Sequence, residues 1–421
     1  MNLNLRVIII PFLVILSINN QAQTAGCMDL NANNYSSSAT VNNGSCVYAT
    51  TNYTPTFITN LDVEMDESSA LIAIDGHTWT LNDSGNPAAI FQLDTLNGNV
   101  LRTVYISNAS NHDWEAMAQN NTHIFLGDFG NNGGSRQNLR ILKISKSQLN
   151  ITTNDSVQAE IIRFVYPEQT DFTAGNNNTN FDCEAFVFAD DSLHLFTKNW
   201  INTQTSHYVI PADSGSYNAR LSETFNVGGL VTDASIDIPS GHVVLLGYKN
   251  IGFNVYTCFS WLLSDYPGQQ YFSGNKRKIE IGNALALGQT EGVHIYANNT
   301  GFISSESISN ATLGINEPAK LHRFDLNPYF PKYAAPGLSI AEQTEEQPII
   351  YPNPTSQSFT FKSRYNTDIK YVLYNTLGKA IMNGLIHFGD NTIHIDFLPK
   401  GSYFLQLENE KQNNTVAIIK N

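Results

Sequence analysis

A short motif that recurs through the middle of the chain constrains the fold more than any other sequence feature. Each copy has a polar or acidic residue at its second position and runs into an apolar, strand-like segment. The copies begin at Ser68-Ser69-Ala70-Leu71, Trp114-Glu115-Ala116-Met117, Cys183-Glu184-Ala185-Phe186, Thr232-Asp233-Ala234-Ser235 and Thr290-Glu291-Gly292-Val293. This alignment makes Ser69, Glu115, Glu184, Asp233 and Glu291 equivalent, at intervals of 46, 69, 49 and 58 residues. Propeller blades of four strands repeat at about 40–50 residues, so the intervals indicate blades with loop insertions.

Each start is followed by a second apolar strand and by turns rich in Asn, Gly and Ser, without helical periodicity. Five starts predict an all-β, five-bladed β-propeller over residues 56–334. A six-bladed ring is the alternative if one blade start has lost its acid. The early strand 56–61 is predicted to complete the last blade, whose own third strand is 321–326.

The overall composition excludes two classes of protein. The chain carries 37 Asp and Glu against 23 Lys and Arg, a net charge of −14, so it has no basic stripe with which to bind nucleic acid. Hydrophobic residues make up 42% and aromatic residues 11%, which is enough to build a sizeable core and argues against disorder.

The N-terminus predicts export. Residues 1–22 have the pattern of a secretory signal peptide, with one charge at Arg6 before an apolar run from Val7 to Leu16. This run is too short for the roughly 20 residues that a membrane-spanning helix needs. We therefore expect no membrane span in the mature protein.

Residues 23–50 form a polar segment with two of the four cysteines, Cys27 and Cys46. In an exported protein a disulfide between them is plausible, and it would stabilise this loop by roughly 3 kcal/mol. The segment resembles short GC-x-D…GSC modules of secreted Bacteroidota proteins. Asp29 is its one carboxylate, so we expect a disulfide-stapled spacer and not a calcium site. Cys183 and Cys258 lack metal-ligand spacing and are predicted to be buried free thiols.

After a linker at 335–347, residues 348–421 alternate between apolar and polar positions and turn at Asn, Gly and Pro, as expected for a small Ig-like β-sandwich. The stretches YPNPTSQSF, YNTLGK, LPKGSYFLQLE and the terminal IIKN closely resemble the type A C-terminal sorting domain of type IX secretion substrates. The resemblance implies handling by the type IX machinery of a Bacteroidota cell. It also implies a location outside the cell or on its outer surface.

The propeller region resembles extracellular propellers related to phytase-like esterase and SdiA-regulated domains. The matching stretches are WTLNDSGNP, DWEAMA with LGDFGNN, DCEAF with LFTKNW, and TDAS, mainly within residues 67–250. Members of that group differ in activity, so the resemblance supports the fold more than any reaction.

Blade geometry predicts where chemistry is located. The first strand of a blade begins, and the second ends, at the same mouth of the channel, so acids at both positions should gather there. The candidate metal ligands are Asp113, Glu115, Asp182, Glu184, Asp233 and Glu291. The accompanying residues of the mouth are Asp83, Asp128, Lys198 and Lys249.

Three interpretations of these acids remain open at the level of sequence. They can cap strands and bind backbone amides between blades, or they can bind a hard cation such as calcium, which takes six to eight oxygens. They can also act as a base on a metal-bound water. Lys198 and Lys249 offer internal salt bridges in place of a metal.

The functional prediction is an exported propeller that binds an extracellular ligand or surface partner of unknown specificity. The alternative is a calcium-dependent hydrolase of phosphate or carboxylic esters. Whether the protein is an enzyme stays open, because no GxSxG elbow, P-loop or HExxH motif occurs.

Overall fold

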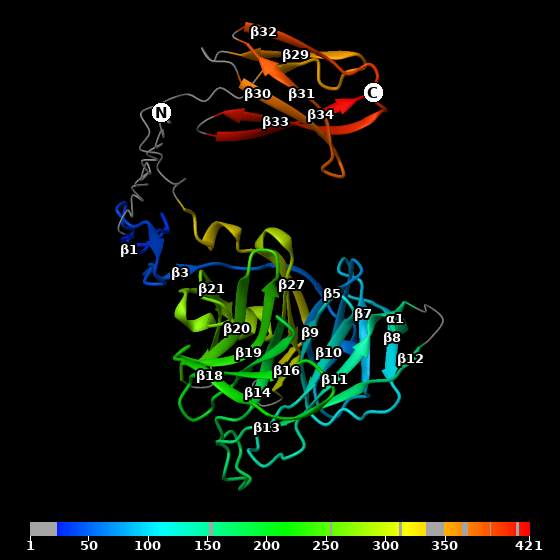
Figure 1. The fold of residues 1–421 in the computed structure, drawn as a ribbon. Helices are drawn as coiled ribbons and strands as arrows, with labels where there is room; N and C mark the ends of the chain where they lie inside the picture. The colour runs from blue at the N-terminus through cyan, green and yellow to red at the C-terminus, as the bar shows by residue number, and fades with distance from the viewer. Residues whose placement is uncertain are drawn as a thin grey trace, which may run out of the picture. The chain divides into compact units, whose positions relative to one another are not determined.

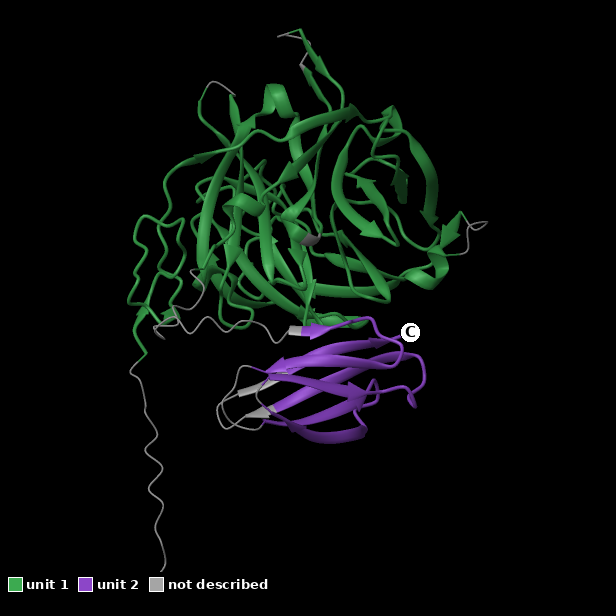
Figure 2. Ribbon diagram, turned by 90° about the horizontal axis from the view of Figure 1, so that it is seen from above, with its two compact units in different colours: residues 1–336 green, residues 337–421 purple. Residues whose placement is uncertain are grey.

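The computed structural model describes residues 23–150, 155–252, 255–310, 314–333, 349–363, 369–387, 389–409 and 412–421. The chain divides into two compact units, residues 1–336 and 337–421 (Figure 2). The predicted signal peptide at 1–22 and the linker at 335–347 lie outside the described residues.

The first unit is a propeller of five antiparallel sheets that follow one another along the chain (Figure 1). Blade 1 consists of β5 (Ser68–Ile74), β6 (His77–Asn82), β7 (Ala89–Leu93) and β8 (Val100–Ile106). Blade 2 consists of β9 (Trp114–Gln119), β10 (His123–Asp128), β11 (Arg140–Ser145) and β13 (Glu160–Val165). Blade 3 consists of β14 (Cys183–Ala189), β15 (Ser192–Thr197), β16 (Thr205–Pro211) and β18 (Arg220–Phe225).

Blade 4 consists of β19 (Leu230–Asp237), β20 (His242–Asn250), β21 (Tyr256–Ser264) and β22 (Asn275–Asn283). Blade 5 contains β23 (Gln289–Ile295), β24 (Thr300–Glu306) and β27 (Lys320–Asp325). Two short strands extend blades 1 and 2 at their outer edges, β12 (Ser156–Val157) and β17 (Gly215–Asn218). In the described part of the chain the helices are single turns, among them α1 (Lys146–Leu149) and α2 (Ala284–Leu287).

The ring closes because a strand from the N-terminal end of the unit joins the last blade. The N-terminal strand β4 (Thr56–Asn60) pairs antiparallel with β27 and completes blade 5, which confirms the predicted closure. The first strands of neighbouring blades contact one another, including β23 against β5. The five-bladed prediction is therefore confirmed.

The first strands are buried on both faces because each lies between two other blades. Trp79 and Trp114 are core residues of one cluster between blades 1 and 2, and Phe125 and Phe186 belong to the next. Because alternate residues pack against opposite neighbours, continuous apolar runs such as those of β5 and β14 are favoured in these strands.

The cysteine-bearing segment docks on the propeller. The disulfide joins Cys27 to Cys46, as predicted, and Cys183 and Cys258 are buried free thiols. Asp29 is fully buried and accepts hydrogen bonds from the backbone of Asn31 and of Lys332 and from the hydroxyl of Tyr48. Its carboxylate thus ties the N-terminal segment to the end of the propeller, a structural role. β1 (Ala25–Gly26), β2 (Val41–Asn42) and β3 (Thr51–Asn52) also belong to this segment, and β3 pairs with β22.

The second unit is a β-sandwich of two sheets around one apolar cluster that includes Phe359, Phe361 and Leu405. One sheet contains β28 (Ile349–Tyr351), β29 (Ser358–Ser363) and β32 (Gly389–His394). The other contains β30 (Ile369–Asn375), β31 (Ala380–Ile386), β33 (Gly401–Asn409) and β34 (Gln412–Lys420). Among the described residues, no helix has the length and apolar character to cross a membrane.

Candidate functional site

Every blade carries a β-bulge at the start of its first strand. In each case the pairing with the second strand skips one residue. The skipped residues are Ser69, Glu115, Glu184, Thr232 and Glu291. A bulge re-aims a side chain relative to the regular pleat, and bulges are over-represented beside active sites. The recurring motif of the sequence is therefore the bulge itself.

A second set of side chains lies at the end of the second strand of each blade. In each blade the residue before the bulge pairs with a residue of the second strand, and the residue after that partner belongs to this set. Ser68 pairs with Asn82, Trp114 with Asp128 and Cys183 with Thr197, and Val231 and Thr290 have the corresponding partners Gly247 and Ser305. The next residues along the chain are Asp83, Phe129, Lys198, Tyr248 and Glu306. Bulges and second-strand ends thus bring two rings of side chains to one end of the channel.

Blade 4 departs from the predicted alignment by one position. The bulge residue is Thr232, whereas Asp233 pairs in register with Leu246. The Asp233 carboxylate accepts hydrogen bonds from the backbone N–H groups of Ala234 and Val293, at 2.8 and 2.6 Å, and so links blade 4 to blade 5. Asp233 therefore follows the capping interpretation and is not grouped with the other candidate ligands.

Because of the same offset, a tyrosine lies at the mouth where a lysine was predicted. Tyr248 occupies the position of the second ring in blade 4, and Lys249, the next residue, is exposed. Lys249 was predicted to lie at the mouth, and this prediction is corrected: the side chain is exposed and forms no ion pair with a described carboxylate. A one-residue difference in register turns a side chain to the other face of a strand, so spacing alone does not resolve it.

Lys198 neutralises one side of the mouth. Its Nζ lies 3.1 Å from Oε2 of Glu184, and both side chains are about 6% exposed. Burial by itself lowers the pKa of Lys198, but the surrounding carboxylates, Glu184 foremost, raise this pKa well above its usual value. The ammonium group also lies 5.2 Å from the centre of the Tyr248 ring. This pair is the internal salt bridge that the sequence offered as an alternative to a metal.

Other carboxylates of the mouth, the predicted Asp182 and Glu291 and also Glu306, accept hydrogen bonds from groups of the protein. Asp182 accepts hydrogen bonds from the indole N–H of Trp200, at 2.7 Å, and from the backbone of Asn131. Gln289 donates to both Glu291 and Glu306, at 2.7 and 3.0 Å. These carboxylates have partners without any cation.

Asp128 forms ion pairs with two arginines and does not belong to the ring of side chains at the mouth. Its carboxylate is fully buried and lies 2.9 Å from Arg136 and 2.8 Å from Arg140. Phe129, and not Asp128, holds the second-ring position of blade 2. The predicted role of Asp128 as a ligand residue is therefore replaced by a structural one.

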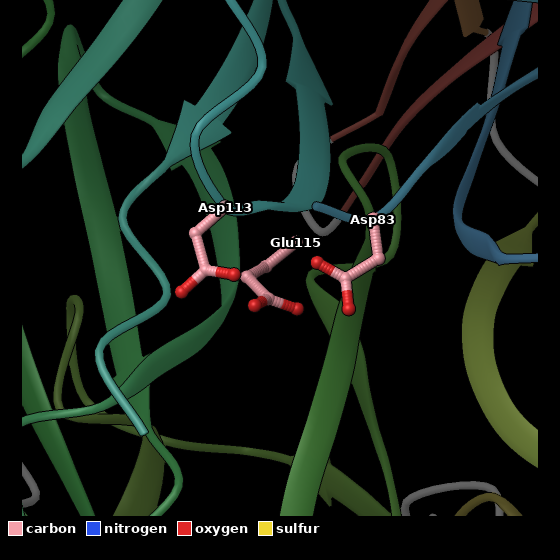
Figure 3. A group of neighbouring side chains, drawn as sticks. All are labelled: Asp83, Asp113 and Glu115. Atoms are coloured by element: carbon pink, nitrogen blue, oxygen red, sulfur yellow. The ribbon is translucent and has the colours of Figure 1, made fainter. Parts of the chain in front are cut away.

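Three further carboxylates lie together, and two of them have no ion-pair partner among the described residues. Asp83, Asp113 and Glu115 each offer an oxygen atom that lies within 4.8 Å of the corresponding atoms of the other two. Figure 3 shows Asp113 and Glu115 extending from the start of β9 and Asp83 from the end of β6, with the three carboxylates turned toward one another. The ion pair nearest to them joins Asp113 to Arg136 at 3.8 Å. Asp83 and Glu115 form no ion pair with any described residue.

Local contacts fix the positions of these three side chains. Asn111 donates hydrogen bonds to the backbone carbonyls of Asn82 and Asp83 and accepts one from the backbone of Trp114. This side chain thereby clamps the end of β6 to the start of β9. Gly130 lies against the cluster so closely that a Cβ atom there would be 2.1 Å from Oε1 of Glu115 and 2.6 Å from Oδ2 of Asp113.

Burial and repulsion by neighbouring carboxylates disfavour the ionised forms of all three groups. Burial raises the pKa of Asp113 to about 7, with a further contribution from Asp83. Burial likewise raises the pKa of Glu115 well above its usual value, and Asp83, Glu184 and Asp113 add to the effect. The pKa of Asp83 is also raised by burial, against the opposing hydrogen bond from the Ser84 backbone.

Sequence reasoning missed Arg136, Gly130 and Tyr248. Arg136 comes from the LGDFGNN loop region and reaches back to Asp128 and Asp113. No spacing rule connects such a loop residue to a strand end. The GDFGNN stretch did mark the turn, and Gly130 is its second glycine.

Comparison with known proteins identifies the second unit. Residues 349–421 match the family model described as "Secretion system C-terminal sorting domain". The C-terminal unit is a type IX sorting domain. The protein is therefore secreted or displayed on the outer surface. No curated protein sequence matches the chain.

Several solved structures are similar in fold to the chain at very low sequence identity. An exo-β-1,3-galactanase of Phanerochaete chrysosporium in complex with galactose is 10% identical, with 90% of this chain and 96% of that chain covered and a TM-score of 0.40. A GH43 β-1,3-galactosidase is 10% identical over 86% and 83% of the two chains, with a TM-score of 0.40. The extracellular domains 1–2 of Drosophila Semaphorin 1b are 8% identical over 87% and 88%, with a TM-score of 0.28. No activity is transferred from these proteins.

Proposed function

We propose that the propeller is an extracellular ligand-binding module whose binding centre is a Ca²⁺ ion held by Asp83, Asp113 and Glu115. The observation that carries this proposal is the convergence of three carboxylate oxygens within 4.8 Å, two of them on side chains that have no ion-pair partner among the described residues. A bound cation would neutralise these buried like charges, and carboxylate oxygens are hard ligands that suit Ca²⁺.

The rest of the mouth supports this assignment by contrast. Glu184 is neutralised by Lys198, and Asp128 by Arg136 and Arg140. The mouth thus contains carboxylates with built-in partners next to a group of three, of which only Asp113 has an ion-pair partner among the described residues, Arg136 at 3.8 Å. A bound cation would offset the repulsion that raises the pKa values of Asp113 and Glu115.

The absence of a side chain at Gly130 keeps the required space open. Because a Cβ atom would meet both Glu115 and Asp113, any larger residue would push the two carboxylates from their positions. Three protein carboxylates leave part of the six to eight ligand positions of Ca²⁺ to water or to oxygens of a ligand. A ligand rich in oxygen atoms would therefore be recruited through the ion.

The test is calcium binding by the full chain, measured by calorimetry and by metal content after dialysis. We expect one Ca²⁺ per chain and a melting temperature that falls when EGTA is added. The Asp113→Asn and Glu115→Gln variants should lose the ion. Asp213→Asn removes the same charge from a side chain that is 88% exposed, and it should keep the ion. Unchanged binding in the cluster variants, or no binding in the wild type, would contradict the proposal.

The same preparations decide between binding and hydrolysis. We would assay p-nitrophenyl phosphate and p-nitrophenyl acetate with Ca²⁺ and with EGTA. Turnover that requires Ca²⁺ and disappears in Glu115→Gln would assign the hydrolase activity of the alternative prediction. Calcium binding without turnover supports the binding module.

A further inference from the structure

The opposite end of the propeller channel opens into a pocket. The first strands run in the same direction around the ring, as shown by the hydrogen bonds from Val293 to Asp233 and from Ile295 to Ser235. The ends of β9, β14 and β19 therefore meet at one face. They do so about four residues, roughly 13 Å, beyond the bulges. A pocket of about 760 Å³ lies there.

The floor of this pocket is apolar and continues into the channel. Phe188, Ile236 and Ile238 line both the pocket and a smaller cavity of about 100 Å³ that extends inward to Ile72 and Met117. The Phe188 ring is held parallel to Phe125, with ring centres 5.7 Å apart. A flat, immobilised apolar surface is thus available at the base of an open pocket.

The walls carry hydrogen-bonding groups with unused capacity. Gln269 donates to Oδ2 of Asp190 at 2.7 Å, which leaves the Gln269 carbonyl and the other Asp190 oxygen as acceptors. Lys146 donates to Gln119 at 2.8 Å and has further N–H groups. Tyr271 also lines the pocket, is 1% exposed, and has a hydroxyl without a hydrogen-bond partner among the described residues.

We propose that this pocket binds a neutral carbohydrate, such as the end of a glycan chain. The hydroxyl groups of a sugar donate and accept at once, which matches a wall of amide, carboxylate, ammonium and phenol groups. The C–H face of a sugar ring is apolar and fits the Phe188 and Ile236 floor. Because Asp190 and Lys146 place opposite charges around the same pocket, a strongly charged ligand would meet one repulsive wall.

This site is separate from the Ca²⁺ cluster, which lies at the other end of the channel. The two proposals therefore fail independently. Sugar binding at this pocket should persist in EGTA and in the Asp113→Asn variant. Sugar binding that needs Ca²⁺ would place the sugar at the carboxylate mouth and would overturn the present proposal.

The experiment uses the full chain and a panel of glucose, galactose, mannose and their β-linked disaccharides. Saturation-transfer NMR identifies a binding sugar, and calorimetry then gives its affinity. We expect Gln269→Ala combined with Asp190→Asn to weaken the affinity at least tenfold. Tyr271→Phe should also weaken it without lowering the melting temperature, because the hydroxyl has no protein partner to lose.

Asp213→Asn, on an exposed side chain, is the control and should bind like the wild type. The proposal is overturned if no sugar of the panel gives saturation transfer at about 10 mM. It is also overturned if both pocket variants, with unchanged melting temperatures, bind as the wild type does.

Discussion

Nζ of Lys198 lies 3.1 Å from Oε2 of Glu184 inside the carboxylate mouth, and both side chains are almost fully buried. One lysine thereby neutralises the side formed by blades 3 and 4. On the side formed by blades 1 and 2, with Asp83, Asp113 and Glu115, the described ion pair is the longer one between Asp113 and Arg136, at 3.8 Å, and this arginine lies closer to Asp128, at 2.9 Å. This asymmetry divides the mouth into a structural half and a half that is available to a cation.

Replacing Lys198, which neutralises the buried Glu184, should destabilise the propeller strongly. Lys198→Met leaves Glu184 buried without its partner, and we expect a loss of about 3–5 kcal/mol in the free energy of unfolding. Lys278→Met breaks a similar pair with Glu280, at 2.9 Å, but on side chains that are 28% and 34% exposed. This control should cost less than about 1 kcal/mol. Equal losses in a urea titration would contradict the division of the mouth.

Stability without metal should depend on pH through Asp113. Its pKa is raised from 3.8 to about 7, so the folded state holds a proton that the unfolded state has released. The resulting stabilisation is fully present below about pH 4 and is lost as the pH rises through about 7. In EGTA, the melting temperature of the wild type should fall relative to that of Asp113→Asn between pH 5 and pH 8.

Buried histidines change the pH dependence of stability in the opposite direction. The quantity to measure is therefore the difference in melting temperature between the wild type and Asp113→Asn. Burial lowers the pKa of His194, His294 and His322 to about 4, so they cost stability as the pH falls below about 6.5. They are common to the wild type and the variant and cancel in the difference. A difference that does not change with pH would refute the assignment to Asp113.

A methyl group at Gly130 should disrupt the cluster. In Gly130→Ala the new Cβ would collide with the carboxylates of Glu115 and Asp113, so we expect at least a tenfold loss of Ca²⁺ affinity. Gly133→Ala is a matched control in the same loop, because the nearest atom to its Cβ would be 4.0 Å away. Calorimetric titration of both variants decides the point. Equal affinities would show that the space at Gly130 does not matter.

The disulfide should stabilise the N-terminal segment that packs on the propeller. Cys27 and Cys46 are 19 residues apart, and replacing both with Ala should cost about 3 kcal/mol of unfolding free energy. A reductant should lower the melting temperature of the wild type by a similar margin and leave the variant unchanged. A reductant effect of the same size on both proteins would trace it to another group.

The sequence was sufficient for the repeat, the closure of the ring and the C-terminal sorting domain. Five motif starts gave five blades, the strand at 56–61 completes the last one, and residues 349–421 form the sorting domain. These features depend on local alternation, turn residues and contiguous motifs. Such patterns are encoded in consecutive residues and are legible without knowing distant contacts.

Only the tertiary structure decided which acids share the mouth without a partner. Asp233, Asp128 and Glu115 look alike in the sequence, yet one binds backbone amides, one binds two arginines, and one faces Asp83 and Asp113. The difference arises from a one-residue register in blade 4 and from the reach of Arg136 out of a loop. Strand register and long-range ion pairing depend on which strands and loops lie opposite each other in the folded ring. No pattern of consecutive residues specifies either of them.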